Sequence, residues 1–358
     1  MAISDVVPVR SDRCGLDELF LSHEPGAAER ARLALGPGWT RQWTATWQVP
    51  GGDEVSLVRD LGPVPVAGRE PVRRFSWGRR QRHRPGLQFM VSTGRVHGFE
   101  SLEEQALLLA LDFTGVLEDV LPQPFTLRFG AADGGFLDHV PDFLAVFRDG
   151  SRWLLDVRPV RLVKEDDAVC FAAAAEAALE AGWRYSVVAG WRPHVRTGID
   201  ALSAQRRDLQ DRLGLQERLL EAVSAGPVAF GDLVSAVPLA AVARAHALHL
   251  LWRRRLGTDL SRPLGDASPV WLAGHQPFPP ARPGSSSCRR GRRCCWAAGS
   301  GRCRPSRPST AGCCFARAGR NGGGASGGWR TILTAGPSRT MMPRCRPGRV
   351  GSRRFWRT

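Results

Sequence analysis

The chain has 358 residues, of which 43% are hydrophobic, so it has enough apolar side chains to build two or three packed domains. No run approaches 18 uninterrupted apolar residues, and the start, Met-Ala-Ile-Ser-Asp, lacks the basic and apolar regions of a secretory signal. The sequence therefore predicts a cytoplasmic protein with no membrane span. The net charge of +16 lies entirely in the tail after residue 273, which contains 18 Arg and no Asp, Glu or Lys, while residues 1–273 carry 32 basic and 34 acidic side chains. This distribution excludes a basic surface over the whole chain, and affinity for DNA must come from local patches.

Residues 1–75 form an N-terminal extension with scattered apolar patches and several Pro and Gly. A stripe of Trp at a spacing of four favours core packing over a platform for stacking bases, and it consists of Trp39, Trp43 and Trp47. Residues 73–84 then interleave Arg with Phe and Trp. This basic stretch is equally compatible with contacts to phosphates and bases and with a solvated surface loop.

Residues 76–200 predict a mixed α/β domain. Asp149-Gly150 stands between runs rich in Val, Phe, Leu and Trp, which is typical of a hairpin turn. A later run of Ala, Glu and Leu has high helix propensity and ends at Gly182, a residue suited to a helix C-terminus. The elements expected in chain order are a strand over 87–92, a helix over 101–111, a strand over 125–129, a hairpin over 140–158, a helix over 168–181 and a strand over 183–188.

Residues 201–272 predict a winged-helix domain, because three helices are followed by a small hairpin. The helices are expected over 209–225, over 230–237 and from Pro238, in the first turn, to 251. Two short extended runs follow within 258–272. His246 and His249 lie at positions i and i+3 of the third helix, and without a nearby Cys or carboxylate they indicate a helix face rather than a metal site.

Residues 273–358 lose both hydrophobic patterning and acidic residues, and Gly, Pro, Ser, Arg and Cys dominate. One interpretation is a disordered basic tail. The other is translation of GC-rich DNA out of frame, which the combination of Cys and Trp favours. Seven of the nine Cys lie here, including two adjacent doublets, a spacing that does not match structural zinc sites. The two others, Cys14 and Cys170, are expected to be ordinary apolar residues.

The hairpin over 140–158 carries the chemistry, because pairing its strands brings Asp142 and Asp156 together at one end. Two carboxylates on an apolar sheet are costly to bury without a cation, and Mg²⁺ suits hard oxygen ligands. The predicted site is a Mg²⁺ ion held by the two aspartates and the carbonyl of Val157. Glu104 is expected to ligate the ion directly or through water, and Arg158 to bind the phosphate.

Each of these residues also has a simpler interpretation. Asp142 and Asp156 would be solvent-facing residues at strand ends, paired with arginines. Glu104 would belong to a capping box with Ser101, in which each side chain bonds the other's backbone. Glu100 and Glu103 compete with Glu104 for a catalytic role. No phosphate-binding loop of the type G-x-x-x-x-G-K-[ST] is present, so ATP hydrolysis is not supported.

Together these motifs resemble the PD-(D/E)XK nucleases and, more closely, the TnsA-like endonuclease subunit of heteromeric transposases. The resemblance covers about residues 85–195, and the winged helix extends it to about 272. The motifs that carry it are, in order, S-L-E-E-Q-A-L-L-L-A-L-D-F, Q-P, V-P-D-F, L-L-D-V-R and the Gly182-Trp183 that opens a strand.

The resemblance implies a restriction-endonuclease-like mixed sheet flanked by helices, and an enzyme that cuts DNA at the 5′ side of each transposon end. Its partners would be a DDE-type transposase, which cuts and joins the 3′ ends, and an AAA+ regulator. In this family the winged domain is associated with partner binding. The metal-site roles pass by position to Glu104, Asp142 and Asp156, with Mg²⁺ as the cofactor and Mn²⁺ as a substitute.

One residue departs from the pattern, since Arg158 stands where the motif has Lys. Arginine keeps the positive charge but does not give up a proton at working pH, so it cannot act as a general base. Lys164 is a weak substitute. Two alternatives therefore stay open: a catalytically silent assembly subunit that retains the nuclease fold, and a stand-alone restriction- or repair-type nuclease.

Overall fold

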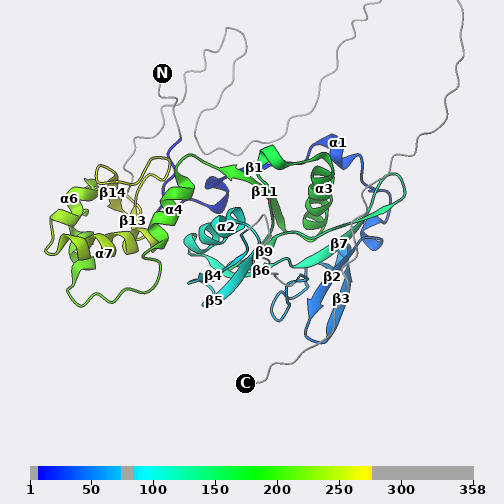
Figure 1. Cartoon of the computed structure of the whole chain (residues 1–358), viewed down its shortest axis with the longest axis horizontal. Coiled ribbons are helices and arrows are strands. Elements are labelled where there is room, and N and C mark those ends of the chain that lie inside the picture. The colour runs from blue at the N-terminus through cyan, green and yellow to red at the C-terminus, as the bar shows by residue number, and fades with distance from the viewer. Residues whose placement is uncertain (1–6, 74–83, 276–358) are drawn as a thin grey trace, which may run out of the picture. The chain divides into compact units, whose positions relative to one another are not determined.

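The computed structural model of the chain describes residues 7–73 and 84–275, which belong to one compact unit, Met1–Ser285 (Figure 1). The interior of the predicted basic stretch and the predicted tail beyond residue 275 lie outside the described residues. The described part is a mixed α/β structure with several antiparallel sheets. None of the helices in it is long and apolar enough to cross a membrane.

The largest sheet carries the predicted site and mixes parallel with antiparallel strands. Its parallel pair, β10 and β11, is joined by α3 (Glu165–Glu180), as parallel neighbours require a crossover. The other three pairs are antiparallel. In spatial order the strands are β1 (Phe20–His23), β11 (Arg184–Trp191), β10 (Arg152–Val157), β9 (Phe143–Phe147) and β6 (Leu117–Pro122).

The predicted hairpin is confirmed as β9 and β10. Gly150 in its turn has a φ of +81°, a conformation that glycine adopts without strain. The Asp149 side chain accepts a hydrogen bond from the backbone N–H of Ser151 at 2.9 Å, which fixes the turn locally. The register places Leu155 opposite Phe143. The next pair of residues at that end of the hairpin is therefore Asp142 and Asp156.

Each face of this sheet has its own hydrophobic core, because successive side chains of a strand point to opposite faces. Trp153 and Leu155 of β10 pack into the core that contains α2 (Leu102–Phe113). Leu154 packs into the core that contains the alanines of α3. Both helices were predicted, and α3 begins three residues earlier than expected, at Glu165.

Residues 1–75 supply strands to two sheets. β1 lies at the edge of the largest sheet, and β2 and β3 belong to a four-stranded antiparallel sheet (Figure 1). Trp43 and Trp47 are fully buried, so the core-packing interpretation of the Trp stripe is confirmed for them, and the Trp39 ring packs against Trp43 at 4.5 Å. The strands of that sheet, in spatial order, are β3 (Gly52–Leu57), β2 (Thr44–Val49), β7 (Phe125–Gly130) and β8 (Phe136–His139).

Some elements were not predicted, and their composition explains why. β8 is an edge strand whose apolar residues are exposed, so no alternation marks it. β6 carries two acidic residues between apolar ones, and α4 (Val195–Ser203) contains a Gly and β-branched residues that lower helix propensity. The hairpin of β4 (Gly86–Met90) and β5 (Arg95–Phe99) contains the one strand predicted here. The short helices are α1 (Ala27–Arg30), η1 (Leu16–Glu18), η2 (Trp39–Arg41), η3 (Val58–Asp60) and η4 (Val160–Leu162).

The part of the chain after α4 has three helices and then a small antiparallel pairing, as predicted. Three details were wrong, and one is that the first strand of this pairing, at Leu256–Gly257, lies before the predicted range of 258–272. The first helix starts at Leu215 rather than 209, because Asp211 accepts hydrogen bonds from the N–H groups of Leu215 and Gln216 and Gly214 turns the chain with a φ of +63°. Pro238 lies before the third helix, which follows Leu239 at a φ of +61°. The elements are α5 (Leu215–Ala222), α6 (Phe230–Ser235), α7 (Ala240–Trp252), β12 (Val228–Ala229), β13 (Leu256–Gly257) and β14 (Pro269–Leu272).

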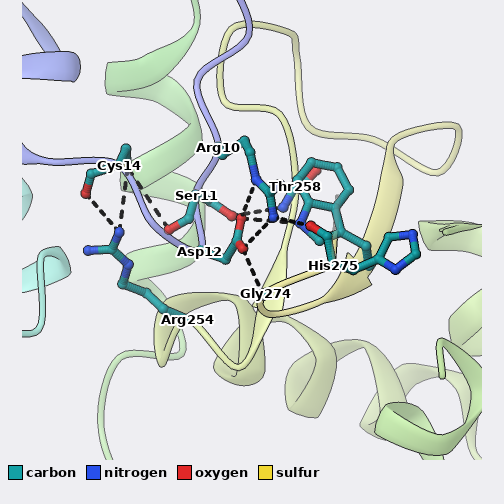
Figure 2. Close-up of polar contacts among 9 residues, drawn as sticks. Arg10, Ser11, Asp12, Cys14, Arg254, Thr258, Gly274 and His275 are labelled. Atoms are coloured by element: carbon teal, nitrogen blue, oxygen red, sulfur yellow. Dashed lines mark hydrogen bonds and ion pairs between the residues drawn. The ribbon is translucent and has the colours of Figure 1, made fainter. Parts of the chain in front are cut away.

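The N-terminal segment (residues 9–14) is bound to this C-terminal part, as Figure 2 shows. Ser11 and Thr258 exchange two hydrogen bonds, from the N–H of Ser11 to the Thr258 carbonyl at 2.9 Å and from the N–H of Thr258 to the Ser11 hydroxyl at 2.8 Å. Asp12 accepts hydrogen bonds from the Trp271 indole at 3.1 Å and from the N–H of Gly274 at 3.2 Å. Residues some 250 positions apart in the sequence are thus part of one packed structure.

Candidate active site

A cavity of about 320 Å³ lies where β9 begins and β10 ends, between the first turns of α2 and α3. All five residues predicted for the site line this cavity: Glu104, Asp142, Asp156, Val157 and Arg158. Two polar groups that sequence reasoning did not single out also line it, His139 and Asp167, together with Arg73, the first residue of the predicted basic stretch. The structure therefore gathers the predicted residues at one place.

Asp142 is fixed from both sides by backbone bonds. Its carboxylate accepts a hydrogen bond from the N–H of Val157 at 2.7 Å, and its carbonyl accepts one from the N–H of Gln123 at 2.7 Å. Burial raises the pKa of Asp142 well above its ordinary value, and the negative charges of Asp156 and Glu104 raise it further. Such a group takes its ionised form most readily when a cation enters the cavity.

Asp156 is almost fully buried and has two partners from other strands. The His139 Nε2 lies 3.1 Å from both carboxylate oxygens, and the Tyr185 hydroxyl donates a hydrogen bond to Oδ2 at 2.7 Å. Burial alone would lower the pKa of His139, but the charge of Asp156 and the bond to it prevail and raise that pKa to about 10. Burial and the same carboxylate raise the pKa of Tyr185 well above its ordinary value, so it stays a hydroxyl donor. Asp156 therefore faces a protonated imidazole at neutral pH.

The position of Glu104 is compatible with both roles that were considered from the sequence. It lines the cavity and also participates in the helix cap. The Ser101 Oγ accepts a hydrogen bond from the N–H of Glu104 at 3.2 Å and donates one to its Oε1 at 2.8 Å. The Glu104 Oε2 accepts from the N–H of Glu100 at 2.8 Å, one residue before the position expected for a capping box. Glu103 instead bonds Arg196 and the indole of Trp191, outside the cavity lining.

The role of Glu104 in the helix cap can be tested by its effect on stability, separately from a role in metal binding. Glu104→Ala removes the two hydrogen bonds that the carboxylate accepts, from the Ser101 hydroxyl and from the N–H of Glu100, but keeps the bond from its own N–H to Ser101. It is expected to lower the free energy of unfolding by about 1 kcal/mol. Glu104→Gln retains an oxygen acceptor for the N–H of Glu100 and is expected to cost less than half as much. Urea unfolding of both variants measures the difference, and equal losses would contradict the cap.

Arg158 lines the cavity but is held at its rim. One guanidinium nitrogen pairs with Asp167 of α3 at 3.1 Å, and Nε donates to the carbonyl of Leu162 at 3.2 Å. Its side chain is about one third exposed, so the guanidinium remains accessible to an anion from outside. Lys164, the suggested substitute, is exposed and does not line the cavity.

The donor set suits a hard cation. Five acidic residues line this one cavity, and burial of this much negative charge is unfavourable unless it is compensated. They are Glu104, Asp142 and Asp156 with Asp167 and Glu100, the competitor considered from the sequence. Mg²⁺ and Mn²⁺ prefer such oxygen ligands. As the side chains stand, no three His, Cys, Asp or Glu groups in the described part of the chain are arranged to enclose one ion. The carboxylates are engaged instead with Val157, His139, Tyr185 and the cap, and metal binding would exchange some of these bonds.

Sequence reasoning missed His139 and Tyr185. His139 stands three residues before Asp142, in the unpredicted strand β8, and Tyr185 lies in the strand after α3. The nearness of His139 to the Pro-Asp motif was the only signal for it. The histidines of α7 are, in contrast, buried and bonded internally: His249 Nδ1 lies 2.8 Å from the Gln205 carbonyl, and His246 Nδ1 lies 3.3 Å from the Gln216 amide.

The chain was compared with protein-family models and with curated protein sequences, and neither comparison finds a match.

Proposed function

We propose that this chain is the Mg²⁺-dependent DNA endonuclease subunit of a TnsA-like heteromeric transposase. It would hydrolyse phosphodiester bonds at the 5′ side of the transposon ends during DNA transposition. The observation that carries the proposal is that Glu104, Asp142 and Asp156, picked out by motif order, line one cavity together with Val157 and Arg158. The partners proposed are the transposon-end DNA, a DDE-type transposase and an AAA+ regulator.

The finer fold assignments belong to the same proposal. The five-stranded sheet with α2 on one face and α3 on the other would be the restriction-endonuclease-like core. Helices α5, α6 and α7 with the β13–β14 pairing would be the winged-helix domain, used for partner contacts. This role suits a body whose net charge is close to zero better than an autonomous grip on DNA.

The side chains divide the catalytic work as follows. Asp142 and Asp156, with Glu104 and the carbonyl of Val157, would hold the ion, which when bound supplies an activated water and neutralises charge that grows on the phosphate. Tyr185 and His139 would hold Asp156 in place through their contacts with its carboxylate, or release it for ligation. Arg158 would bind the phosphate as a fixed positive charge and takes no proton.

The test is cleavage of transposon-end DNA by the full chain with its partner transposase and Mg²⁺. Asp142→Ala and Asp156→Ala are each expected to reduce 5′-end cleavage by about a thousandfold, because each removes a ligand of the reacting centre. Unchanged cleavage in both variants would refute the assignment. Cleavage that needs no transposase would instead support the stand-alone restriction or repair nuclease.

A second candidate function is a catalytically silent assembly subunit, and one observation favours it. The motif position for Lys holds Arg158, whose guanidinium is already paired with Asp167. If the site is active, Arg158→Lys changes cleavage by less than about tenfold, since the charge is kept. If wild-type protein is inactive and Arg158→Lys creates Mg²⁺-dependent cleavage, the chain is a silent subunit. The measurement is the 5′-end cleavage rate of both proteins on the same DNA.

A further inference from the structure

A second and larger cavity, of about 680 Å³, lies near the hairpin turn. It is bordered by the N-terminal residues 13–17, by the chain between α2 and β6, and by the hairpin turn with the strand residues beside it, Phe147 and Trp153. Trp153 lines it, three positions before Asp156 on the same strand. Because alternate residues of a strand face opposite ways, Trp153 and Asp156 lie on opposite faces of the sheet. The two cavities also share no lining residue, so this cavity is separate from the candidate active site.

Part of its lining is apolar. Leu16, Phe147 and Trp153 are buried side chains of the surrounding core, while Val116 at the cavity edge is 51% exposed. The volume lies within the range of pockets that enclose a ligand or a few side chains of a peptide. The apolar lining would gain from contact with an apolar side chain.

The rest of the lining is dominated by arginine, and two of the four arginines are already used. Arg184 lies over the Trp153 ring at 3.9 Å and pairs with Asp17 at 3.3 Å. Arg254 donates to the carbonyls of Thr114 at 2.8 Å and Cys14 at 2.7 Å, so it holds the cavity walls together.

The other two arginines are available. Arg13 and Arg148 are exposed, line the cavity, and have no side-chain hydrogen bond or ion pair within residues 7–73 and 84–275. Two uncompensated guanidinium groups beside an apolar surface are complementary to a ligand that carries both carboxylates and apolar groups.

We propose that this cavity, lined by Arg13, Val116, Phe147, Arg148 and Trp153, binds an acidic and apolar segment of a partner protein. A nucleic-acid backbone suits it less, because a row of sugars and phosphates offers no apolar side chain to Val116, Phe147 and Trp153. The chain's own residues after 273 are excluded as the occupant by charge, since they contain Arg but no Asp or Glu. The site thus serves recruitment at the turn end of the hairpin, away from the candidate catalytic cavity at the other end.

The probe is a fluorescein-labelled octapeptide that alternates Glu with Leu, measured by fluorescence anisotropy with the full chain. Peptides that alternate Gln with Leu and Glu with Ser separate the contributions of charge and of apolar contact. We expect the Glu-Leu peptide to bind at least tenfold more tightly than either control. Arg13→Glu with Arg148→Glu is expected to weaken it at least tenfold, and Val116→Trp, which fills the cavity without changing charge, is expected to do the same.

The matched control is Arg41→Glu with Arg218→Glu, two exposed arginines without side-chain partners in the described part of the chain, which alters the net charge equally. This control is expected to change affinity less than twofold, and it accounts for attraction to the arginines after residue 273. Three results would overturn the proposal. The first is an equal loss of affinity for the Glu-Leu peptide in both double variants, and the second is equal affinity of the wild-type chain for the Glu-Ser and Glu-Leu peptides. The third is that Arg13→Glu with Arg148→Glu loses as much affinity for oligo-dT as for the Glu-Leu peptide. Circular dichroism establishes that each variant is folded.

Discussion

Asp156→Asn is expected to lower the free energy of unfolding by about 3–5 kcal/mol, the cost of breaking a buried ion pair from one side. The carboxylate is 2% exposed and has two partners, His139 and the Tyr185 hydroxyl. An amide offers one oxygen in place of two, turns an N–H group toward these donors, and leaves the imidazole without its counter-charge. Urea unfolding at pH 7 in the presence of a chelator measures this loss for the protein without metal.

The same ion pair sets a pH dependence whose sign follows from His139. Its pKa is about 10 in the folded protein and near 6.5 in an unfolded chain, so the folded state binds more protons between these values. The stability that the pair contributes is fully present below about pH 6.5 and is lost as the pH rises toward 10. Asp156→Asn and His139→Asn are both expected to flatten this decline.

Asp142→Asn is the control in the same cavity. Burial and neighbouring negative charge oppose ionisation of Asp142, so removal of its charge is not expected to destabilise the protein. A gain of about 0.5–2 kcal/mol in the free energy of unfolding is typical when a functional group that destabilises the fold is replaced. A large loss of stability in Asp142→Asn, or none in Asp156→Asn, would contradict this account of the two carboxylates.

The second large effect is expected from Asp12→Asn, with a loss of about 3 kcal/mol or more. The Asp12 side chain is 1% exposed and pairs with Arg10, itself 8% exposed, at 2.7 Å. It also accepts a hydrogen bond from the Trp271 indole. Figure 2 shows its bond from Gly274 and the bond from Arg10 to the carbonyl of His275. The substitution leaves a buried guanidinium without its carboxylate and loosens the N-terminal segment from the C-terminal part of the fold.

Acid should act on the same contact. Burial opposes the ionisation of Asp12, but hydrogen bonds from Arg10, Gly274 and Trp271 prevail and hold its pKa below the ordinary value. A carboxyl of this kind stabilises the fold above its unfolded pKa, and the contribution is lost as the pH falls through the folded value. Asp17→Asn is the control, because its pair with Arg184 is exposed and worth about 0–1 kcal/mol. Equal losses from the two substitutions, measured by urea unfolding, would contradict the special role of Asp12.

The sequence alone predicted the elements whose signals are local. The Asp-Gly turn fixed the β9–β10 hairpin, Ser101 marked the start of α2, and Gly182 followed the end of α3. Asp142 and Asp156 were paired correctly, because hairpin register follows from the turn. Prediction from the sequence failed where a side-chain hydrogen bond to the backbone sets the start of a helix, as the bond from the N–H of Leu215 to Asp211 does for α5. It also failed where an edge strand such as β8 carries no alternation.

The sequence by itself was therefore sufficient to identify Glu104, Asp142 and Asp156 as the carboxylates of the candidate site. The helix cap and the hairpin turn that position them each span only a few residues. Only the tertiary structure decided what surrounds them. Tyr185 meets Asp156 because β11 pairs with β10, whereas His139 comes from β8 of the other sheet, and no local pattern states which strands will be neighbours. The same holds for Asp12 with Trp271 and for the arginine-lined cavity, because burial and charge compensation there depend on contacts between residues far apart in the chain.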